Sequence, residues 1–356
     1  MSRSPRQLFA FLALSVLGLA GGCSQEPQLP TDEALTHLRH WVPYRSNGGL
    51  FFLHRFELRE FDVQHVLPEW GKTHVPTVPD LPAVDLDQNQ AWTVARAYLG
   101  RLPSLEEWRY AVGGDIGFRF PWGNREANPS YANTSELGLR ERTRVGTFES
   151  GRDPTGQGCY DLIGNVAEWT STPLALHPLA LNPIGIPVMS ASFERQREVL
   201  RAAESRLPIS PFVSGVVPWM PELLLEEERR GMRYCTLGFS FAESLRVMET
   251  PGSSGNPIYE SFWDDQGTRP RVPAESDSQL GLRLATDPYT FLARLESHVS
   301  DATAGDVGAL ETFLQAYKMD FKRAAKLRAQ LHRGSLELPA PSALALRAWS
   351  ILGIEP

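Results

Sequence analysis

The chain has 356 residues, of which 42% are hydrophobic and 22% are charged, as in an ordinary globular protein. Because its formal net charge is −7, we expect no general attraction of the whole chain to nucleic acid or to anionic lipid. The 29 glycines and 28 prolines predict many turns and short elements.

The first 22 residues have the pattern of a secretory signal peptide. Arg3 and Arg6 precede an apolar run at residues 8–20, which is shorter than the roughly 20 residues that a bilayer-spanning helix needs. Small residues end the run, as they do in cleaved signal peptides.

Cys23 follows Ala20-Gly21-Gly22, an arrangement that resembles the bacterial lipobox. The resemblance implies that Cys23 is lipidated and that residues 23–42 form an anchor and tether. The lipid would attach the protein to the membrane. Ser24 in place of an aspartate is compatible with export to the outer membrane. The alternative is ordinary signal cleavage, with Cys23 unmodified.

Several elements follow from hydrophobic spacing. We expect a short helix over residues 31–40, in which His37 and His40 share a face without an evident third metal ligand, and a strand at residues 50–53. Over residues 87–100, apolar side chains recur at helical spacing. Ser104 and Glu107 form the capping-box pattern of a second helix, which the pair Gly113-Gly114 should end.

The rest of the chain divides into three parts. Residues 118–168 are rich in glycine, asparagine and aromatics and predict little helix, whereas residues 193–206 can form a charged helix. Residues 280–285 predict a last strand. The tail carries apolar residues at helical spacing beside Lys318, Lys322 and other basic residues. A packed helix with a solvated face is the favoured interpretation, and a basic surface for a membrane or partner is the alternative.

Three blocks resemble the formylglycine-generating enzyme (sulfatase-modifying factor) family. The first, at residues 82–110, contains Arg101-Leu102-Pro103-Ser104 with Glu107-Trp108. The second, at residues 121–170, contains P-W-G-N at its start and G-C-Y-D-L-I-G-N-V-A-E-W-T at residues 158–170. The third is G-L-R-L-A at residues 281–285. Their order agrees with the family pattern.

The resemblance implies an α+β architecture, the irregular C-type-lectin-like fold of this family. It assigns the family domain to residues 43–287, with an insertion at residues 171–230, and leaves residues 288–356 as a helical C-terminal extension. The many glycines and prolines agree with such a fold independently.

The resemblance also implies a structural calcium ion in the second block. Its ligands would be the Asp161 and Glu168 side chains and the Gly164 and Val166 backbone carbonyls, and calcium prefers such mixtures of carboxylate and carbonyl oxygens. Two solvated acids are the alternative. A second family calcium site would use Asn133 and the Thr134 carbonyl, but the short path from Asn133 to Val145 argues against it.

The catalytic pattern of the family is incomplete. Its enzymes bind copper(I), a soft ion, through two cysteine thiolates. The equivalent stretch contains Cys235 alone, and no cysteine follows it, so copper is not expected and Cys235 is only a weak catalytic candidate. Cys159 lies beside the calcium loop instead. These two cysteines can form one disulfide or stay free.

Two functional hypotheses follow. The favoured one is an envelope lipoprotein whose domain binds a protein or glycan partner, or serves as a scaffold, without catalysis. The alternative is a copper-dependent oxidase of the formylglycine-generating type that acts on a cysteine of a protein substrate.

Overall fold

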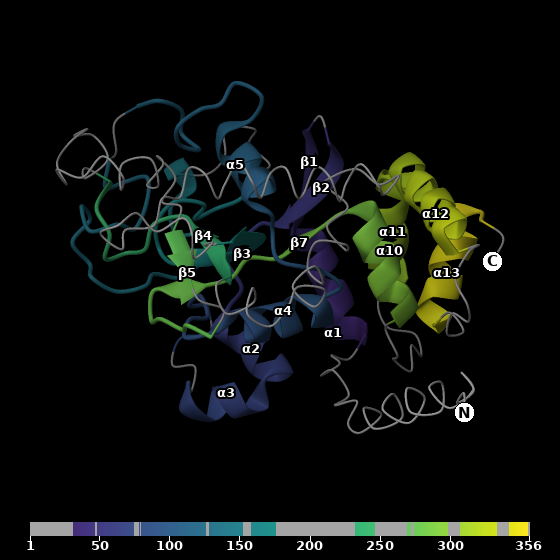
Figure 1. The fold of residues 1–356 in the computed structure, drawn as a ribbon, viewed down its shortest axis with the longest axis horizontal. Helices are drawn as coiled ribbons and strands as arrows, with labels where there is room; N and C mark the ends of the chain where they lie inside the picture. The colour runs from purple at the N-terminus through teal and green to yellow at the C-terminus, as the bar shows by residue number, and fades with distance from the viewer. Residues whose placement is uncertain are drawn as a thin grey trace, which may run out of the picture.

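The computed structural model describes residues 31–46, 48–74, 78, 80–125, 128–151, 158–175, 232–245, 269–271, 274–297, 307–332 and 342–354. Three sequence predictions lie outside them: the signal peptide, the modified Cys23 and the helix at residues 193–206, as does most of the 171–230 insertion. The structure mixes short helices and strands, with β3, β4 and β5 at one end, a helical group at the other and a hairpin between (Figure 1). This α+β fold is the one expected.

The described chain begins with a helix and a hairpin. α1 (Thr31–Thr36) continues directly into the single 3-10 turn η2 (His37–His40), which confirms the helical segment at residues 31–40. β1 (Trp41–Ser46) and β2 (Gly49–His54) pair in antiparallel fashion. Both faces of β2 are buried, so this strand lies inside the core rather than on its surface.

Four helices follow before the irregular region: α2 (Glu60–Val66), α3 (Pro68–Thr73), α4 (Gln88–Ala97) and α5 (Leu105–Gly113). The capping box of α5 is formed as predicted, because the Glu107 N–H donates to Ser104 Oγ over 3.1 Å and the Ser104 N–H donates to Glu107 Oε2 over 3.0 Å. Gly114, at φ +59°, ends the helix. In the described part of residues 118–168, the only helical element before β3 is the 3-10 turn η3 (Glu149–Gly151).

Two small sheets organise the remaining strands. β2 pairs with β1 on one side and with β7 (Ala285–Thr286) on the other. The second sheet has the order β5 (Arg269–Arg271), β4 (Met232–Leu237), β3 (Ala167–Ala175) and β6 (Leu280–Gly281), in which β3 and β6 are parallel.

The single strand predicted at residues 280–285 is wrong in one respect. The segment forms two short strands, β6 and β7, that belong to different sheets. Between them the Leu282 and Leu284 carbonyls accept hydrogen bonds from the Leu58 and His54 N–H groups. The chain therefore crosses from one sheet to the other, and Arg283 lies at the crossing.

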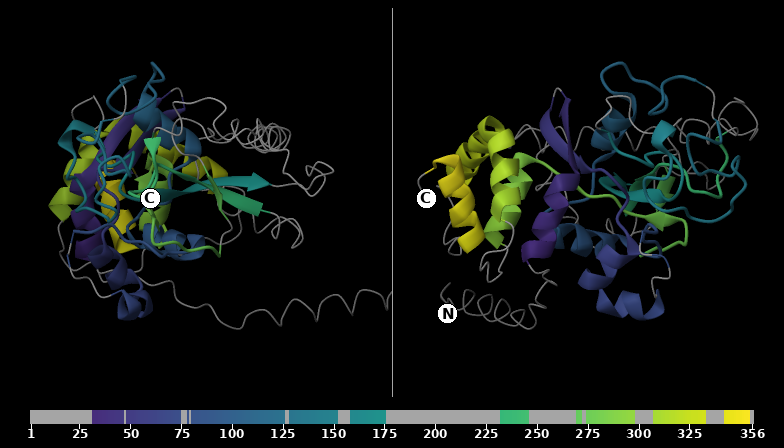
Figure 2. Two further views of the ribbon diagram at one scale, coloured as in Figure 1. Left: turned by 90° about the vertical axis from the view of Figure 1, so that its left-hand side faces the viewer. Right: turned by 180° about the vertical axis from the view of Figure 1, so that it is seen from behind.

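The C-terminal residues form a helical extension: α10 (Pro288–Ser297), α11 (Val307–Ala316), α12 (Lys318–His332) and α13 (Ala343–Leu352). Their apolar side chains, among them Leu310, Phe313 and Phe321, belong to one buried cluster with Phe52 of β2. The Phe52 and Phe313 rings lie 5.0 Å apart. The extension thus packs on the hairpin, as Figure 2 shows from two further sides.

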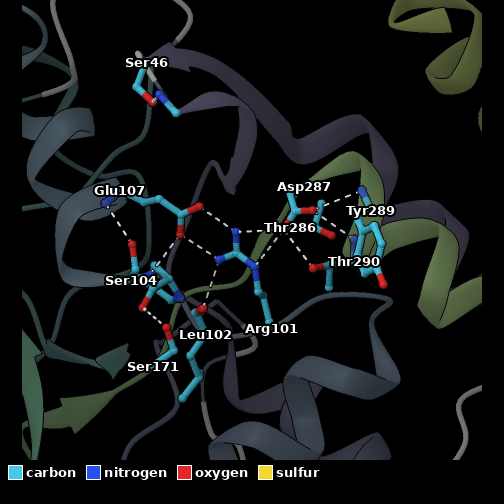
Figure 3. Close-up of polar contacts among 12 residues, drawn as sticks. Ser46, Arg101, Leu102, Ser104, Glu107, Ser171, Thr286, Asp287, Tyr289 and Thr290 are labelled. Atoms are coloured by element: carbon cyan, nitrogen blue, oxygen red, sulfur yellow. Dashed lines mark hydrogen bonds and ion pairs between the residues drawn. The ribbon is translucent and has the colours of Figure 1, made fainter. Parts of the chain in front are cut away.

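A buried ion-pair network joins the first sequence block to Asp287, two residues after the third block (Figure 3). Arg101, which is fully buried, donates from Nη1 to Glu107 Oε2 over 2.7 Å and from Nε to Asp287 Oδ2 over 3.2 Å. The other oxygen of Asp287 accepts from the Tyr289 and Thr290 N–H groups at the start of α10. Arg101 therefore connects the capping box of α5 with the first turn of the helical extension.

Candidate functional site

The loop at residues 161–168 curls as a ligand-binding loop would. Asp161, Gly164 and Asn165 all have positive φ, at 53°, 87° and 62°. A Cβ on Gly164 would lie 2.7 Å from the Asn133 carbonyl oxygen, so only glycine fits there. The curl brings the two predicted carboxylates, Asp161 and Glu168, into the buried interior, where each side chain is at most 5% exposed.

Each of these carboxylates has protein donors. Asp161 Oδ2 accepts from the Gly146 N–H over 2.6 Å. Glu168 accepts from Arg283 Nη2 over 2.7 Å and from Trp108 Nε1 over 3.1 Å. Glu168 therefore holds Arg283, and the same Nη2 donates to the Tyr160 carbonyl. The structure places the four predicted calcium residues in one loop, with a guanidinium against one of the two carboxylates.

A third carboxylate, Glu57, is fully buried and was not predicted from the sequence. Its oxygens accept from Asn165 Nδ2 over 2.6 Å and from the Val166 N–H over 3.0 Å. The only local signal was its place between the apolar Phe56 and Leu58, because an acid in a buried segment needs partners.

The carboxylate cluster, defined as Glu57, Asp161 and Glu168, carries more negative charge than Arg283 neutralises. Burial raises the pKa of the Asp161 carboxyl to about 6. Burial, together with Asp161 and Glu168, holds the pKa of Glu57 well above its usual range, and burial also raises that of Glu168. Three raised pKa values mean that the cluster favours uptake of positive charge.

An excess of acidic groups over cations is compatible with a bound cation. The carboxylate oxygens and the backbone carbonyl oxygens of the curled loop are the types of ligand that calcium prefers. Among the described residues no three His, Cys, Asp or Glu side chains are arranged to hold a metal. A calcium ion here would therefore depend on backbone carbonyls and on no more than two carboxylates, as the predicted ligand set does.

Asn133 lies against this loop. Its carbonyl accepts from the Asn165 N–H over 2.7 Å, and its Nδ2 donates to the Glu141 carbonyl over 2.8 Å. Its Oδ1 is buried and has no hydrogen-bond partner among the described residues. The Thr134 carbonyl, the other residue of the doubted second site, accepts from the Leu137 N–H. At the position of the second calcium site, the structure therefore shows one buried oxygen, Asn133 Oδ1, without a hydrogen-bond partner among the described residues.

The two cysteines that the structure describes, Cys159 and Cys235, are both buried, and neither is in a disulfide. Cys235 lies on β4, and burial raises the pKa of its thiol to about 12, whereas the thiolate is the form that binds copper or attacks a substrate. The Cys159 thiol donates to the His54 carbonyl over 3.4 Å. No disulfide joins them, and the weak catalytic candidate lies in an apolar cluster.

A histidine cluster adjoins the hairpin. His37 Nδ1 lies 3.1 Å from His54 Nε2, and His54 Nδ1 lies 2.9 Å from the Phe56 carbonyl. Because that carbonyl only accepts, His54 carries its proton on Nδ1, and His37 donates to it. His37 Nε2 is 3.6 Å from Asp62 Oδ1. His54 is therefore the third member of the cluster that His37 and His40 begin.

Comparisons with known proteins agree with the three sequence blocks. The family model "Sulfatase-modifying factor enzyme 1-like domain" matches residues 56–287, more than half of the chain. Formylglycine-generating enzyme from Bos taurus is 34% identical over 136 residues, covering 34% of this chain and 35% of that protein. The Bos taurus protein named inactive C-alpha-formylglycine-generating enzyme 2 is 36% identical over 97 residues, covering 23% and 31%.

The chain spans about a third of the length of these curated relatives. Among solved structures, PvdO from Pseudomonas aeruginosa aligns with 67% of this chain and 80% of its own, with a TM-score of 0.38 and 17% identity. No helix in the described part of the chain is long and apolar enough to cross a membrane.

Proposed function

Because this chain belongs to the sulfatase-modifying factor family, we propose that it uses the family fold as a non-catalytic binding or scaffold module of the cell envelope. A lipid on Cys23 would hold it there, most consistently in the outer membrane. The observation that carries the proposal is the state of Cys235. Cys235 is fully buried, burial raises the pKa of its thiol to about 12, and no cysteine follows it in the sequence.

Copper(I) chemistry needs two accessible thiolates. Cys159 does not supply the second one, because its thiol is hydrogen-bonded to the His54 carbonyl in the interior. A relative named as inactive also has a domain of this type. Both points support binding over catalysis.

The partner would be a protein or glycan of the envelope. Loops on a rigid scaffold are the usual place for such binding, and the 171–230 insertion joins β3 to β4 of the second sheet. Together with the helical extension, this insertion is where we place the partner surface.

We also propose that calcium binds at Asp161, Gly164, Val166 and Glu168 in a structural role. The charge excess of the carboxylate cluster supports this, since a divalent cation would neutralise what Arg283 leaves over. When bound, the ion would fix the curl of the loop. Calcium added after treatment with a chelator should raise the melting temperature of the protein, and Asp161→Asn should remove most of that response. An unchanged melting temperature would contradict the calcium proposal.

A copper-dependent oxidase is the second candidate, favoured by the 34% identity to a formylglycine-generating enzyme. Incubation with copper(I), oxygen and a cysteine peptide carrying a sulfatase motif tests both candidates, with peptide mass as the measurement. We expect no conversion beside an active family enzyme as control. Conversion that Cys235→Ala abolishes would overturn the binding module and establish an enzyme.

A pull-down from envelope extract then tests binding directly. The bait is the protein carrying Cys23→Ser, and the matched control lacks the insertion but keeps the β3 and β4 strands. A partner retained by the first protein and lost by the second supports the proposed surface. Equal retention by both would place the partner surface elsewhere.

A further inference from the structure

One face of the helical extension is strongly basic, although the whole chain has a net charge of −7. Helices α11 to α13 contain two acidic residues, Glu311 and Asp320. The same helices contain six basic residues, namely Lys318, Lys322, Arg323, Lys326, Arg328 and Arg347. Helices α11 to α13 are therefore a local exception to the acidic character of the chain.

Ion pairs remove two of these charges from consideration. Asp320 pairs with Arg45 of β1 over 2.7 Å. Arg328 is buried and donates from Nε to Glu296 of α10 over 3.1 Å. The cations that remain on α12 are exposed or half-exposed, and three of them recur at intervals of four residues, which aligns them along one side of a helix. We name these residues the α12 basic face: Lys318, Lys322, Arg323 and Lys326.

An apolar side chain adjoins this face. Met319, next to Lys318 and one helical turn before Arg323, is 75% exposed. Its exposure contrasts with Phe321 and Ala324 on the opposite side, which are buried in the core. A surface with aligned cations around one protruding apolar residue suits the boundary between lipid headgroups and acyl chains.

The same end of the molecule receives the tether. α1 begins at Thr31, and its Ala34 and Leu35 share the buried cluster with Leu310 of α11. Figure 1 and the view from behind in Figure 2 show α1 beside the helical group α10 to α13. Seven residues lie between Cys23 and Thr31, and the eight Cα–Cα steps of a fully extended chain between them span at most about 28 Å. A lipid on Cys23 would therefore keep the helical end near the membrane.

We propose that the α12 basic face binds the anionic phospholipid headgroups of the leaflet that holds the anchor. The inference rests on lipidation of Cys23 for its orientation in the cell, but the attraction itself does not need the lipid. Charges more than about 10 Å away are screened at about 0.1 M salt, so the charges on and beside α12 matter more for contact with a membrane than the net charge of the whole chain. Each basic side chain at such a surface strengthens binding about fivefold.

Vesicle binding by the chain carrying Cys23→Ser tests the face separately from the anchor. We expect co-sedimentation with vesicles that contain phosphatidylglycerol, little with pure phosphatidylcholine, and loss of binding in 0.5 M salt. The variant with Lys322→Glu, Arg323→Glu and Lys326→Glu should bind at least about tenfold more weakly, with an unchanged circular dichroism spectrum.

The matched control reverses three other exposed cations, through Lys72→Glu, Arg140→Glu and Arg144→Glu. It changes the net charge equally and should bind like the parent chain. Equal weakening by both triple variants, or stronger binding to an acidic protein or to nucleic acid than to the vesicles, would overturn the proposal. A separate mass measurement of the lipid on Cys23 decides the anchor, so the two proposals fail independently.

Discussion

Arg101 and Arg283 are two buried arginines that pair with buried carboxylates. They differ in whether the negative charge around them is balanced. Arg101 lies between Glu107 and Asp287, and the start of α10 takes up the second oxygen of Asp287. Arg283 lies against Glu168, with Glu57 and Asp161 buried close by. The first network is complete within the protein, whereas the second retains excess negative charge. The comparison separates a structural ion pair from a site that favours a further cation.

The largest effect should come from breaking the complete network. Arg101→Met leaves two buried carboxylates without their cation, and removal of one partner of a buried pair costs about 3–5 kcal/mol. Chemical denaturation of variant and parent measures this loss in the free energy of unfolding. Arg140→Met, at an exposed position, is the control and should change stability by less than about 0.5 kcal/mol.

The incomplete network should respond differently at two of its carboxylates. Glu168→Gln removes the ion pair of Arg283 and should destabilise by about 3 kcal/mol. Glu57→Gln removes one excess charge and keeps acceptor capacity for Asn165 and Val166, so without calcium it should cost much less. Thermal and chemical unfolding of both variants in chelator distinguish them. An equal loss would mean that Glu57 is needed as an anion, contrary to the charge excess inferred above.

The pH dependence sharpens the same contrast. The pKa of Asp161 is raised to about 6 in the folded protein, so between the unfolded value and about 6 the folded state binds more protons. Its contribution is full at low pH and is lost as the pH rises through about 6. In chelator, acidification from about pH 7 to 5 should therefore stabilise the parent by about 1 kcal/mol relative to Asp161→Asn. Saturating calcium should abolish this difference.

A smaller effect of opposite sign should come from His40. Burial, followed by the charge of His37, lowers the pKa of this half-exposed side chain to about 4. The folded state then binds fewer protons than the unfolded chain, so stability from this group is present above about pH 6.5 and is lost as the pH falls toward 4. Unfolding of His40→Gln against the parent at several pH values measures it. A parent that loses no more stability than the variant would contradict the shift.

Sequence patterns predicted the local elements well. The capping box of Ser104 and Glu107, the helix after Asp87 and the strand within residues 50–53 follow from short-range rules, and the structure confirms each. The buried character of the α12 helix was also the favoured prediction for its apolar side, and Phe321 bears it out.

Long-range pairings could not be read in the same way. Glu57 lies far from residues 161–168 in the sequence, and only tertiary packing brings it to the Val166 N–H. Likewise, His54 could not be joined to His37 without knowing that β2 lies beside η2. The division of residues 280–285 between two sheets depends on Arg283, whose four acceptor groups come from three distant segments.

The pairing of β2 with β7 has a consequence for the order of folding. Phe52 and Leu53 find their strand partners in Thr286 and Ala285, and the same hairpin is covered by α11 from still later in the chain. Contacts of such sequence separation form late, because a long loop must close before they stabilise anything. The β1–β2 hairpin, which lies nearest the proposed anchor, should therefore keep its apolar faces exposed until residues beyond 285 pack against it. If the N-terminus is anchored to a membrane, the part of the core nearest the anchor would be the last to form.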